Sequence, residues 1–157
     1  GSDHTPFLEA DIPGLLLWHF TDQFYHTDND RIDKVSQETL KNVGTAALVS
    51  GLQLINASDF FVHEQIQILK EQAINRLKDE IELTNKVKEN GGSMSEESLI
   101  VMAWFDWYTE SLNTLNDIIP DENKAAKQAI VEAQGELSSE LRKLGQSLND
   151  DVFKWKF

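Results

Sequence analysis

The sequence predicts a mainly α-helical chain in which one strand, a loop and one helix precede a long-helix hairpin or a three-helix bundle. The first observation is that apolar residues recur every three or four positions over most of residues 58–148, as in amphipathic helices. The second is that Asn90-Gly91-Gly92 and Pro120 interrupt this spacing and divide it into helices joined by short loops. The third is a short apolar run, Leu15–Phe20, that lacks the helical spacing.

The run Leu15–Phe20 is predicted to be a strand buried on both faces, as in a parallel sheet covered by helices. A buried helical turn is the alternative, and Pro13-Gly14 directly before the run favours the strand. His19 lies inside the run and is interpreted as a core histidine. The Asp- and Asn-rich residues 21–34 that follow are predicted to form a loop, because such side chains hydrogen-bond to their own backbone in turns.

A helix is predicted from Ser36 to about Ile55. Ser36 suits the N-cap, and Glu38 lies in the first turn, where the helix dipole favours an anion. A second helix is predicted from about residue 59 to Asn90. The third should start at Ser95 and stop at Pro120, and Asp121-Glu122 should open the fourth. The short loops between the long helices imply antiparallel neighbours.

The predicted domain boundary lies at residues 56–59, which gives one domain over 1–57 and a helical domain over 58–157. The helical domain carries an aromatic cluster for which core packing is the first interpretation and a groove for a partner or ligand the alternative. Its members are Trp104, Phe105, Trp107 and Tyr108. His63 has no partner at a ligand spacing and is interpreted as a helix-surface residue.

Composition excludes several classes of function. The net charge of −13 and pI near 4.6 argue against nucleic-acid binding, which needs clustered Lys and Arg. The absence of cysteine excludes disulfides and thiolate chemistry but leaves the compartment open. No apolar run approaches the roughly 20 residues needed to span a bilayer, so no membrane span is predicted.

Four short elements in the first third carry the candidate chemistry. They are Ser2-Asp3-His4-x-Pro6-Phe7, then Ile12-Pro13 before the apolar run, then Tyr25-His26-Thr27-x-x-Asp30, then Asp33-Lys34-Val35 leading into a helix. In this order and spacing they resemble the C-terminal end of the catalytic domain of di-zinc aminopeptidases of the bacterial leucyl aminopeptidase type. That group also includes glutamate carboxypeptidases and glutaminyl cyclases. The resemblance does not extend to residues 58–157.

The resemblance implies an α/β domain that binds two zinc ions, of which this chain is expected to hold only a truncated end. In the family, the ligands come from a His-x-Asp motif, from acidic residues and from a late His, which corresponds to His26. The other ligands and the general-base Glu are expected upstream of residue 1. In the complete enzyme the two zinc ions activate a water, which the Glu deprotonates for attack on a peptide carbonyl.

The resemblance also suggests that four further residues line the active site or support its ligands: Asp3, His4, Tyr25 and Asp30. Asp3 and His4 would line or brace the cleft, with a purely structural turn as the alternative. Tyr25 would contact the substrate or pack within the loop. Either Asp30 or Asp28 would orient His26 or hold its loop.

The expected function is therefore that of a zinc-dependent exopeptidase fragment, inactive and without zinc on its own, whose parent enzyme hydrolyses peptides. The alternatives are a glutaminyl cyclase-like acyltransferase of the same fold and a helical interaction or dimerisation module without catalysis. We expect a homo-oligomer with residues 7–20 at the contact, because the orphaned strand needs covering. The family suggests a periplasmic or extracellular location. Gly1-Ser2 is open to two interpretations, a cloning remnant or the start of the first motif.

Overall fold

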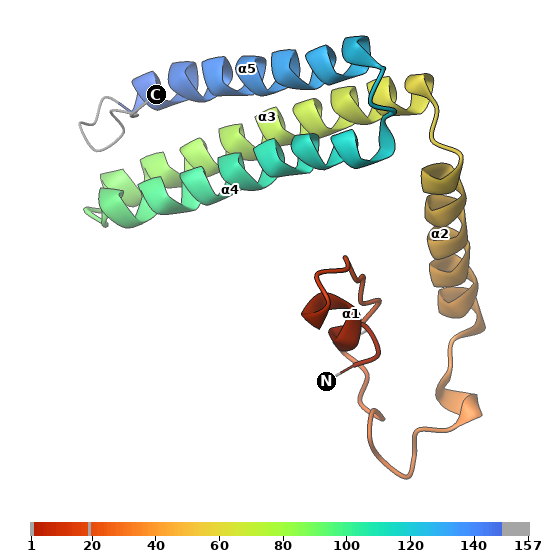
Figure 1. The fold of residues 1–157 in the computed structure, drawn as a ribbon. Helices are drawn as coiled ribbons and strands as arrows, with labels where there is room; N and C mark the ends of the chain where they lie inside the picture. Colours follow the sequence, from red (N-terminus) through yellow and green to blue (C-terminus); the bar gives the residue numbers. More distant parts are fainter. Residues whose placement is uncertain (1, 19, 149–157) are drawn as a thin grey trace. The chain divides into compact units, whose positions relative to one another are not determined.

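The computed structural model describes residues 2–18 and 20–148, and the regular secondary structure of these residues is entirely helical (Figure 1). The predicted mainly α-helical class is confirmed. The chain divides into two compact units, Gly1–Leu52 and Gln53–Phe157. None of the helices in the described ranges combines the length and the hydropathy needed to cross a bilayer. In chain order the elements are α1 (Thr5–Glu9), the 3-10 turn η1 (Ile32–Lys34), α2 (Gln37–Ile55), α3 (Asp59–Glu89), α4 (Met94–Thr114), the 3-10 turn η2 (Leu115–Ile118) and α5 (Lys124–Ser147).

The second unit is a three-helix bundle, in which α3, α4 and α5 pack against one another (Figure 1). At one end of the bundle, the Asn123 side chain donates to the Asp59 carboxylate over 2.7 Å, which ties the start of α5 to the start of α3. At the other end, the Lys88 ammonium donates to the carbonyl oxygen of Leu148. Therefore α3 and α5 run in the same direction and α4 runs antiparallel to both. The three-helix alternative for this region is confirmed.

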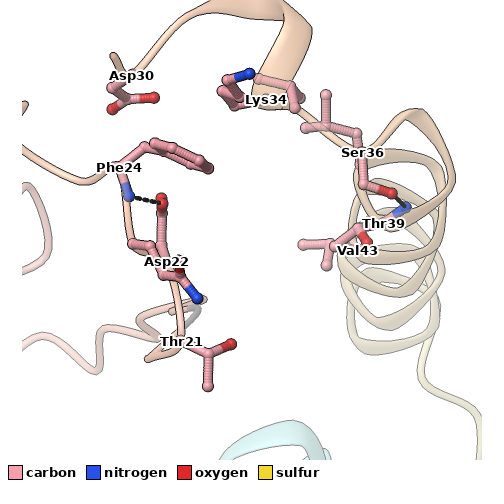
Figure 2. A pocket seen from close by; sticks show the side chains of 11 residues that line it. Thr21, Asp22, Phe24, Asp30, Lys34, Ser36, Thr39 and Val43 are labelled. Atoms are coloured by element: carbon pink, nitrogen blue, oxygen red, sulfur yellow. Dashed lines mark hydrogen bonds between the residues drawn. The ribbon is translucent and has the colours of Figure 1, made fainter. Parts of the chain in front are cut away.

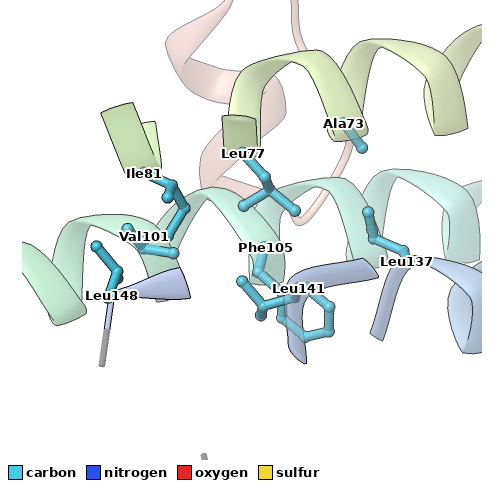
Figure 3. Packing of buried hydrophobic residues seen from close by; sticks show 8 residues of the cluster. All are labelled: Ala73, Leu77, Ile81, Val101, Phe105, Leu137, Leu141 and Leu148. Atoms are coloured by element: carbon cyan, nitrogen blue, oxygen red, sulfur yellow. The ribbon is translucent and has the colours of Figure 1, made fainter. Parts of the chain in front are cut away.

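The bundle core consists of two clusters of buried apolar residues, each drawn from all three helices. Figure 3 shows one of them, in which side chains of α3, α4 and α5 meet along a common seam. Its members are Ala73, Leu77, Ile81, Val101, Phe105, Leu137, Leu141 and Leu148. The other cluster consists of Val62, Ile66, Leu112, Leu115, Ile119, Ala126, Ile130 and Ala133. The 3–4 spacing of the sequence therefore marks the residues that the bundle buries.

The end of α3 follows from its two glycines. Gly91 adopts a left-handed φ of 72°, and its N–H donates to Lys88 O over 3.0 Å. The Gly92 N–H donates to Val87 O over 2.9 Å. These two bonds form a Schellman motif, which satisfies carbonyls that the helix end leaves without partners. The predicted stop at residues 90–92 is confirmed.

Two predicted helix starts are wrong by a few residues. The N-cap of α4 is Ser93 and not Ser95, because the Ser93 hydroxyl accepts the Glu96 N–H over 3.3 Å and so places Met94 against the core. Asn123 caps α5 in place of Asp121-Glu122, because its side-chain oxygen accepts the Ala126 N–H over 3.1 Å. α4 ends at Thr114, before Pro120, and passes into η2.

The aromatic cluster of α4 is divided between core and surface. Phe105 is buried in the core, and Trp104 and Tyr108 pack partly buried against it. Trp107 is exposed and meets Tyr108 edge-on, with ring centroids 4.7 Å apart. The core interpretation therefore holds for most of the cluster. His63 is exposed on α3, as interpreted from the sequence.

A buried ion pair lies beside the same cluster and was not predicted. Glu80 on α3 is 4% exposed and pairs with Arg76 one turn earlier. The Arg76 guanidinium carbon lies 4.0 Å from the centroid of the Trp104 ring on α4. A cation over an aromatic face is attracted by the ring quadrupole, so the pair also links α3 to α4.

The first unit contains α1, the loop and α2 as far as Leu52. Helix α2 spans Gln37–Ile55 with Ser36 as its cap, because the Ser36 hydroxyl accepts the Thr39 N–H over 3.2 Å. The predicted helix over 36–55 is confirmed. None of the described residues from 2 to 50 is buried. The apolar residues of α2 therefore lie on an exposed surface.

The strand predicted over Leu15–Phe20 is wrong for the described part of that run. Residues 12–18 form neither helix nor strand, and the described chain contains no strand with which they could pair. A strand needs a neighbour for its backbone hydrogen bonds, whereas a helix makes them internally. The interpretation of His19 as a core residue falls outside the described residues. Gly1 of the Gly1-Ser2 pair lies outside them as well.

Candidate functional site

His26 lies in an exposed turn of the loop between α1 and α2. Its φ of 60° is left-handed, a conformation in which His, Asn and Asp are enriched among non-glycine residues. The turn is held by Thr27, whose N–H and hydroxyl both donate to Phe24 O, over 3.0 and 2.6 Å. The imidazole is therefore presented at the surface by a locally hydrogen-bonded turn.

Tyr25 fixes the orientation of the neighbouring ring. The Tyr25 and His26 rings stack with centroids 3.9 Å apart and an interplanar angle of 20°. Tyr25 also meets Trp18 edge-on at 5.3 Å. Its ring thus packs within the loop on both sides. A contact with substrate remains a hypothesis, because the exposed part of the ring is free to make one.

The acidic residues near His26 do not orient its imidazole in this structure. The Asp30 N–H donates to Thr27 O over 3.1 Å, and the Asp28 carbonyl accepts from Arg31 Nε over 3.1 Å. These bonds hold the loop through backbone atoms. Neither carboxylate hydrogen-bonds to His26 within the described residues. The roles considered for the Asp28 and Asp30 carboxylates stay predictions.

Asp3 and His4 form the turn that leads into α1. Asp3 is exposed, and His4 stands at the N-cap position without a capping side-chain hydrogen bond. The His4 Nδ1 atom is buried and has no hydrogen-bond partner in the part of the chain that the structure describes. Gly14 closes over this turn, since a Cβ built on it would lie 3.3 Å from both the Cβ and the carbonyl oxygen of His4. The close backbone approach explains the glycine.

A hollow of about 530 Å³ lies between the loop and the start of α2 in the first unit. Figure 2 shows the loop residues on one side and Ser36, Thr39 and Val43 on the other. An Asx turn shapes the loop side, because the Asp22 carboxylate accepts the Phe24 N–H over 2.9 Å. The lining residues are Thr21, Asp22, Gln23, Phe24, Asp30, Lys34, Val35, Ser36, Thr39, Leu40 and Val43.

Of the residues predicted for the active site, this hollow contains only Asp30. Its other charged residues are Asp22 and Lys34, and the Lys34 ammonium lies 5.4 Å from the centroid of the Phe24 ring. Sequence reasoning did not identify the hollow, because it is formed by the path of an irregular loop. Asx-rich composition predicts turns there but does not say which residues face one another.

Zinc does not fit the described residues taken alone. A structural zinc site takes four protein ligands, and a catalytic site takes three plus a water. No group of three or more His, Asp or Glu side chains in the described ranges has a geometry that holds a metal ion. Asp3 and His4 do not join His26 in such a group. His26 is thus one exposed imidazole without companion ligands among residues 2–18 and 20–148.

Comparison with known proteins identifies a related family for the first unit. Residues 1–50 match the model of peptidase family M28. The matched segment is about a third of the 157-residue chain and contains every residue predicted for the site. It leaves the three-helix bundle uncovered. Neither the curated proteins nor the solved structures gave a match to this chain. Over residues 1–50 the chain therefore resembles zinc-type peptidases, at the level of the family and not of any subgroup.

Proposed function

We propose that residues 1–57 form one end of the catalytic domain of a zinc-dependent exopeptidase of the aminopeptidase type, with His26 as one zinc ligand. The match of residues 1–50 to peptidase family M28 carries this proposal. In this proposal, other residues of the catalytic domain provide the general base and the ligands of the second zinc, and they contribute to binding the peptide substrate. The isolated chain is accordingly expected to lack activity.

The local geometry of His26 supports this assignment. The imidazole is exposed, and stacking on Tyr25 restricts its orientation. A left-handed backbone at a non-glycine residue costs free energy, and such strain often occurs at functional sites. A ligand to a metal completed by another segment has to be both accessible and oriented. His4, with its ring nitrogen buried, does not meet the first condition.

The test uses the natural polypeptide that contains these residues, purified with its metal. His26→Ala should remove one zinc and most aminopeptidase activity on aminoacyl-p-nitroanilides, because the metal loses a direct ligand. His63→Ala is the matched control, since it removes an exposed imidazole on α3. Metal analysis and circular dichroism accompany the assay. Full zinc content and near-normal turnover in His26→Ala would show that the wrong histidine has been assigned.

A glutaminyl cyclase-like acyltransferase is the alternative within the same fold. The turn from Ser2 to Phe7 is shared by both types of enzyme, and the match to the family does not separate them. The Tyr25–Thr27 segment with Asp30 supports the peptidase. Assaying the same preparation with an N-terminal glutaminyl peptide distinguishes the two. In the cyclase reaction the α-amine attacks the side-chain amide carbon and ammonia leaves, whereas the peptidase adds water to the peptide bond and releases glutamine.

The bundle supports a second candidate function for residues 58–157, that of a helical interaction module. It has its own core in two clusters, and the family match does not reach it. Residues 58–157 produced alone should fold and unfold cooperatively. A chain that stays unstructured without residues 1–57 would refute the independence of this module.

A further inference from the structure

The connection between α3 and α4 contains the only asparagine of the sequence that a glycine follows, Asn90-Gly91. Such a pair loses its side-chain amide more readily than other asparagine pairs, because glycine lacks the Cβ that would hinder attack by its own backbone nitrogen. Asn90, Gly91 and Gly92 are all exposed, so water reaches the reacting atoms. Sequence and exposure together make Asn90 a candidate for spontaneous modification.

The structure also shows what restrains the two reacting groups. The Asn90 side-chain nitrogen donates to the carbonyl oxygen of Lys86 over 2.7 Å. The Gly91 N–H donates to Lys88 O over 3.0 Å. The first bond holds the leaving group and the second holds the nucleophile, so the reaction requires both bonds to open. Both lie at the C-terminal end of α3, and helix ends open at a small cost in free energy.

We propose that Asn90 deamidates spontaneously in the folded chain and that opening of the end of α3 controls the rate. The Gly91 nitrogen loses its proton and attacks the side-chain carbonyl carbon Cγ of Asn90. A C–N bond forms, the bond between Cγ and Nδ2 breaks, and Nδ2 takes up the proton and leaves as ammonia. The cyclic imide then adds one water and opens to aspartate or isoaspartate. The reaction consumes only water, and the proposal does not depend on a peptidase function.

The product destabilises the helix end that carries it. A carboxylate at position 90 cannot donate to Lys86 O, and its charge lies at the C-terminal end of α3, where the helix dipole disfavours an anion. The Lys86 ammonium in the same turn is already paired with Glu82 over 2.7 Å. Isoaspartate also lengthens the main chain by a carbon and so displaces Gly91 and Gly92 from the Schellman motif. Deamidation therefore loosens the connection between α3 and α4 with time.

The test incubates the 157-residue chain at neutral pH and follows its asparagines by peptide mapping and mass spectrometry. Conversion to the acid should be faster at Asn90 than at Asn113, which lies in α4 and precedes a threonine. The two hydrogen bonds should slow the reaction at Asn90 roughly tenfold relative to the chain unfolded in guanidinium chloride. An Asn90 that stays intact while the unfolded chain is fully converted overturns the proposal, as does equal conversion at Asn113.

Gly92→Ala tests whether the helix end controls the rate. A Cβ built on Gly92 would overlap the Val87 side chain, so the substitution should open the bond from the residue 92 N–H to Val87 O. Asn90 should then react several-fold faster. Gly135→Ala is the matched control, because a Cβ at Gly135 on α5 meets no described atom within 4 Å, and it should leave the rate unchanged. In guanidinium chloride all three chains should react equally. A folded Gly92→Ala chain that reacts at the wild-type rate contradicts control by the helix end.

Two further variants test the loosening of the helix end. Asn90→Asp reproduces the aspartate product, and Asn90→Ala removes the same side-chain hydrogen bond without adding a charge. Asn90→Asp should lower the ratio of folded to unfolded chain about tenfold, and more than Asn90→Ala does, with a difference that shrinks as salt is added. Urea unfolding followed by circular dichroism measures both ratios. Equal stability of Asn90→Asp and wild type would overturn the predicted loosening.

Discussion

The buried ion pair of the bundle leads to a quantitative prediction for Arg76→Met. The substitution keeps the aliphatic stem and removes the charge that Glu80 pairs with, while Glu80 stays 4% exposed. Removing one partner of a fully buried pair costs about 3–5 kcal/mol, and exposed pairs contribute about 0–1 kcal/mol. The Arg76 side chain is 38% exposed, so the expected loss of unfolding free energy is about 2 kcal/mol. This value includes the loss of the contact between the Arg76 guanidinium and the Trp104 ring.

The double variant Arg76→Met/Glu80→Leu separates the charge effect from packing. With both charges removed no carboxylate remains buried, and the stability should return to within about 1 kcal/mol of wild type. Urea unfolding followed by circular dichroism gives the free energies. Lys70→Met is the control, because Lys70 pairs at 2.7 Å with a Glu136 that is mostly exposed, and it should cost less than about 1 kcal/mol.

The double-mutant cycle also defines the refutation. If Arg76→Met lowers the unfolding free energy no more than Lys70→Met does, burial of the Glu80 carboxylate does not depend on its pairing with Arg76. The cycle also needs the single variant Glu80→Leu. If the double variant loses as much unfolding free energy as Arg76→Met and Glu80→Leu added together, the two residues act independently and the ion pair is not the cause.

Three further predictions concern the core, a helix end and the isolated chain. Leu137→Ala should lower the unfolding free energy by about 2–5 kcal/mol because Leu137 is fully buried. The control Leu40→Ala on exposed α2 should change it by less than about 0.5 kcal/mol. Equal effects of the two variants in urea unfolding would contradict the core assignment. Gly91→Ala should cost about 1 kcal/mol or more, because a Cβ is disfavoured at a φ of 72°, and a neutral result would argue against the Schellman end of α3. Isothermal titration of the 157-residue chain should detect no zinc binding at submicromolar affinity, because His26 has no companion ligands among the described residues; stoichiometric tight binding would refute this.

Much of the bundle could be predicted from the sequence, because helix formation depends on local patterns. The 3–4 spacing identified α3, α4 and α5, and the glycines after Glu89 gave the end of α3. The helix starts were harder, since several Ser, Asp and Asn residues near each start are suitable caps. In the structure, Ser93 and Asn123 make the capping hydrogen bonds. The Arg76–Glu80 pair had no signal beyond i,i+4 spacing, which is common on exposed helix surfaces.

The candidate site could be predicted only as residue identities. The motif around His26 singled out the segment that matches the peptidase family, but no pattern indicated that Tyr25 would stack on the imidazole or that Asp30 would face a hollow. Loop conformation depends on side-chain hydrogen bonds such as those of Asp22 and Thr27. Several mutually exclusive sets of such bonds are compatible with one Asx-rich sequence.

The contrast between the two units has a physical cause. Apolar spacing shows which residues favour burial, but it does not show what buries them. In the bundle, the helices that cover Leu77 and Leu137 lie in the same unit, so the predicted core is the observed one. In the first unit, α2 still forms because its hydrogen bonds are internal, yet its apolar residues stay exposed. The run beginning at Leu15 needs both a covering surface and a neighbouring strand, and the described chain supplies neither.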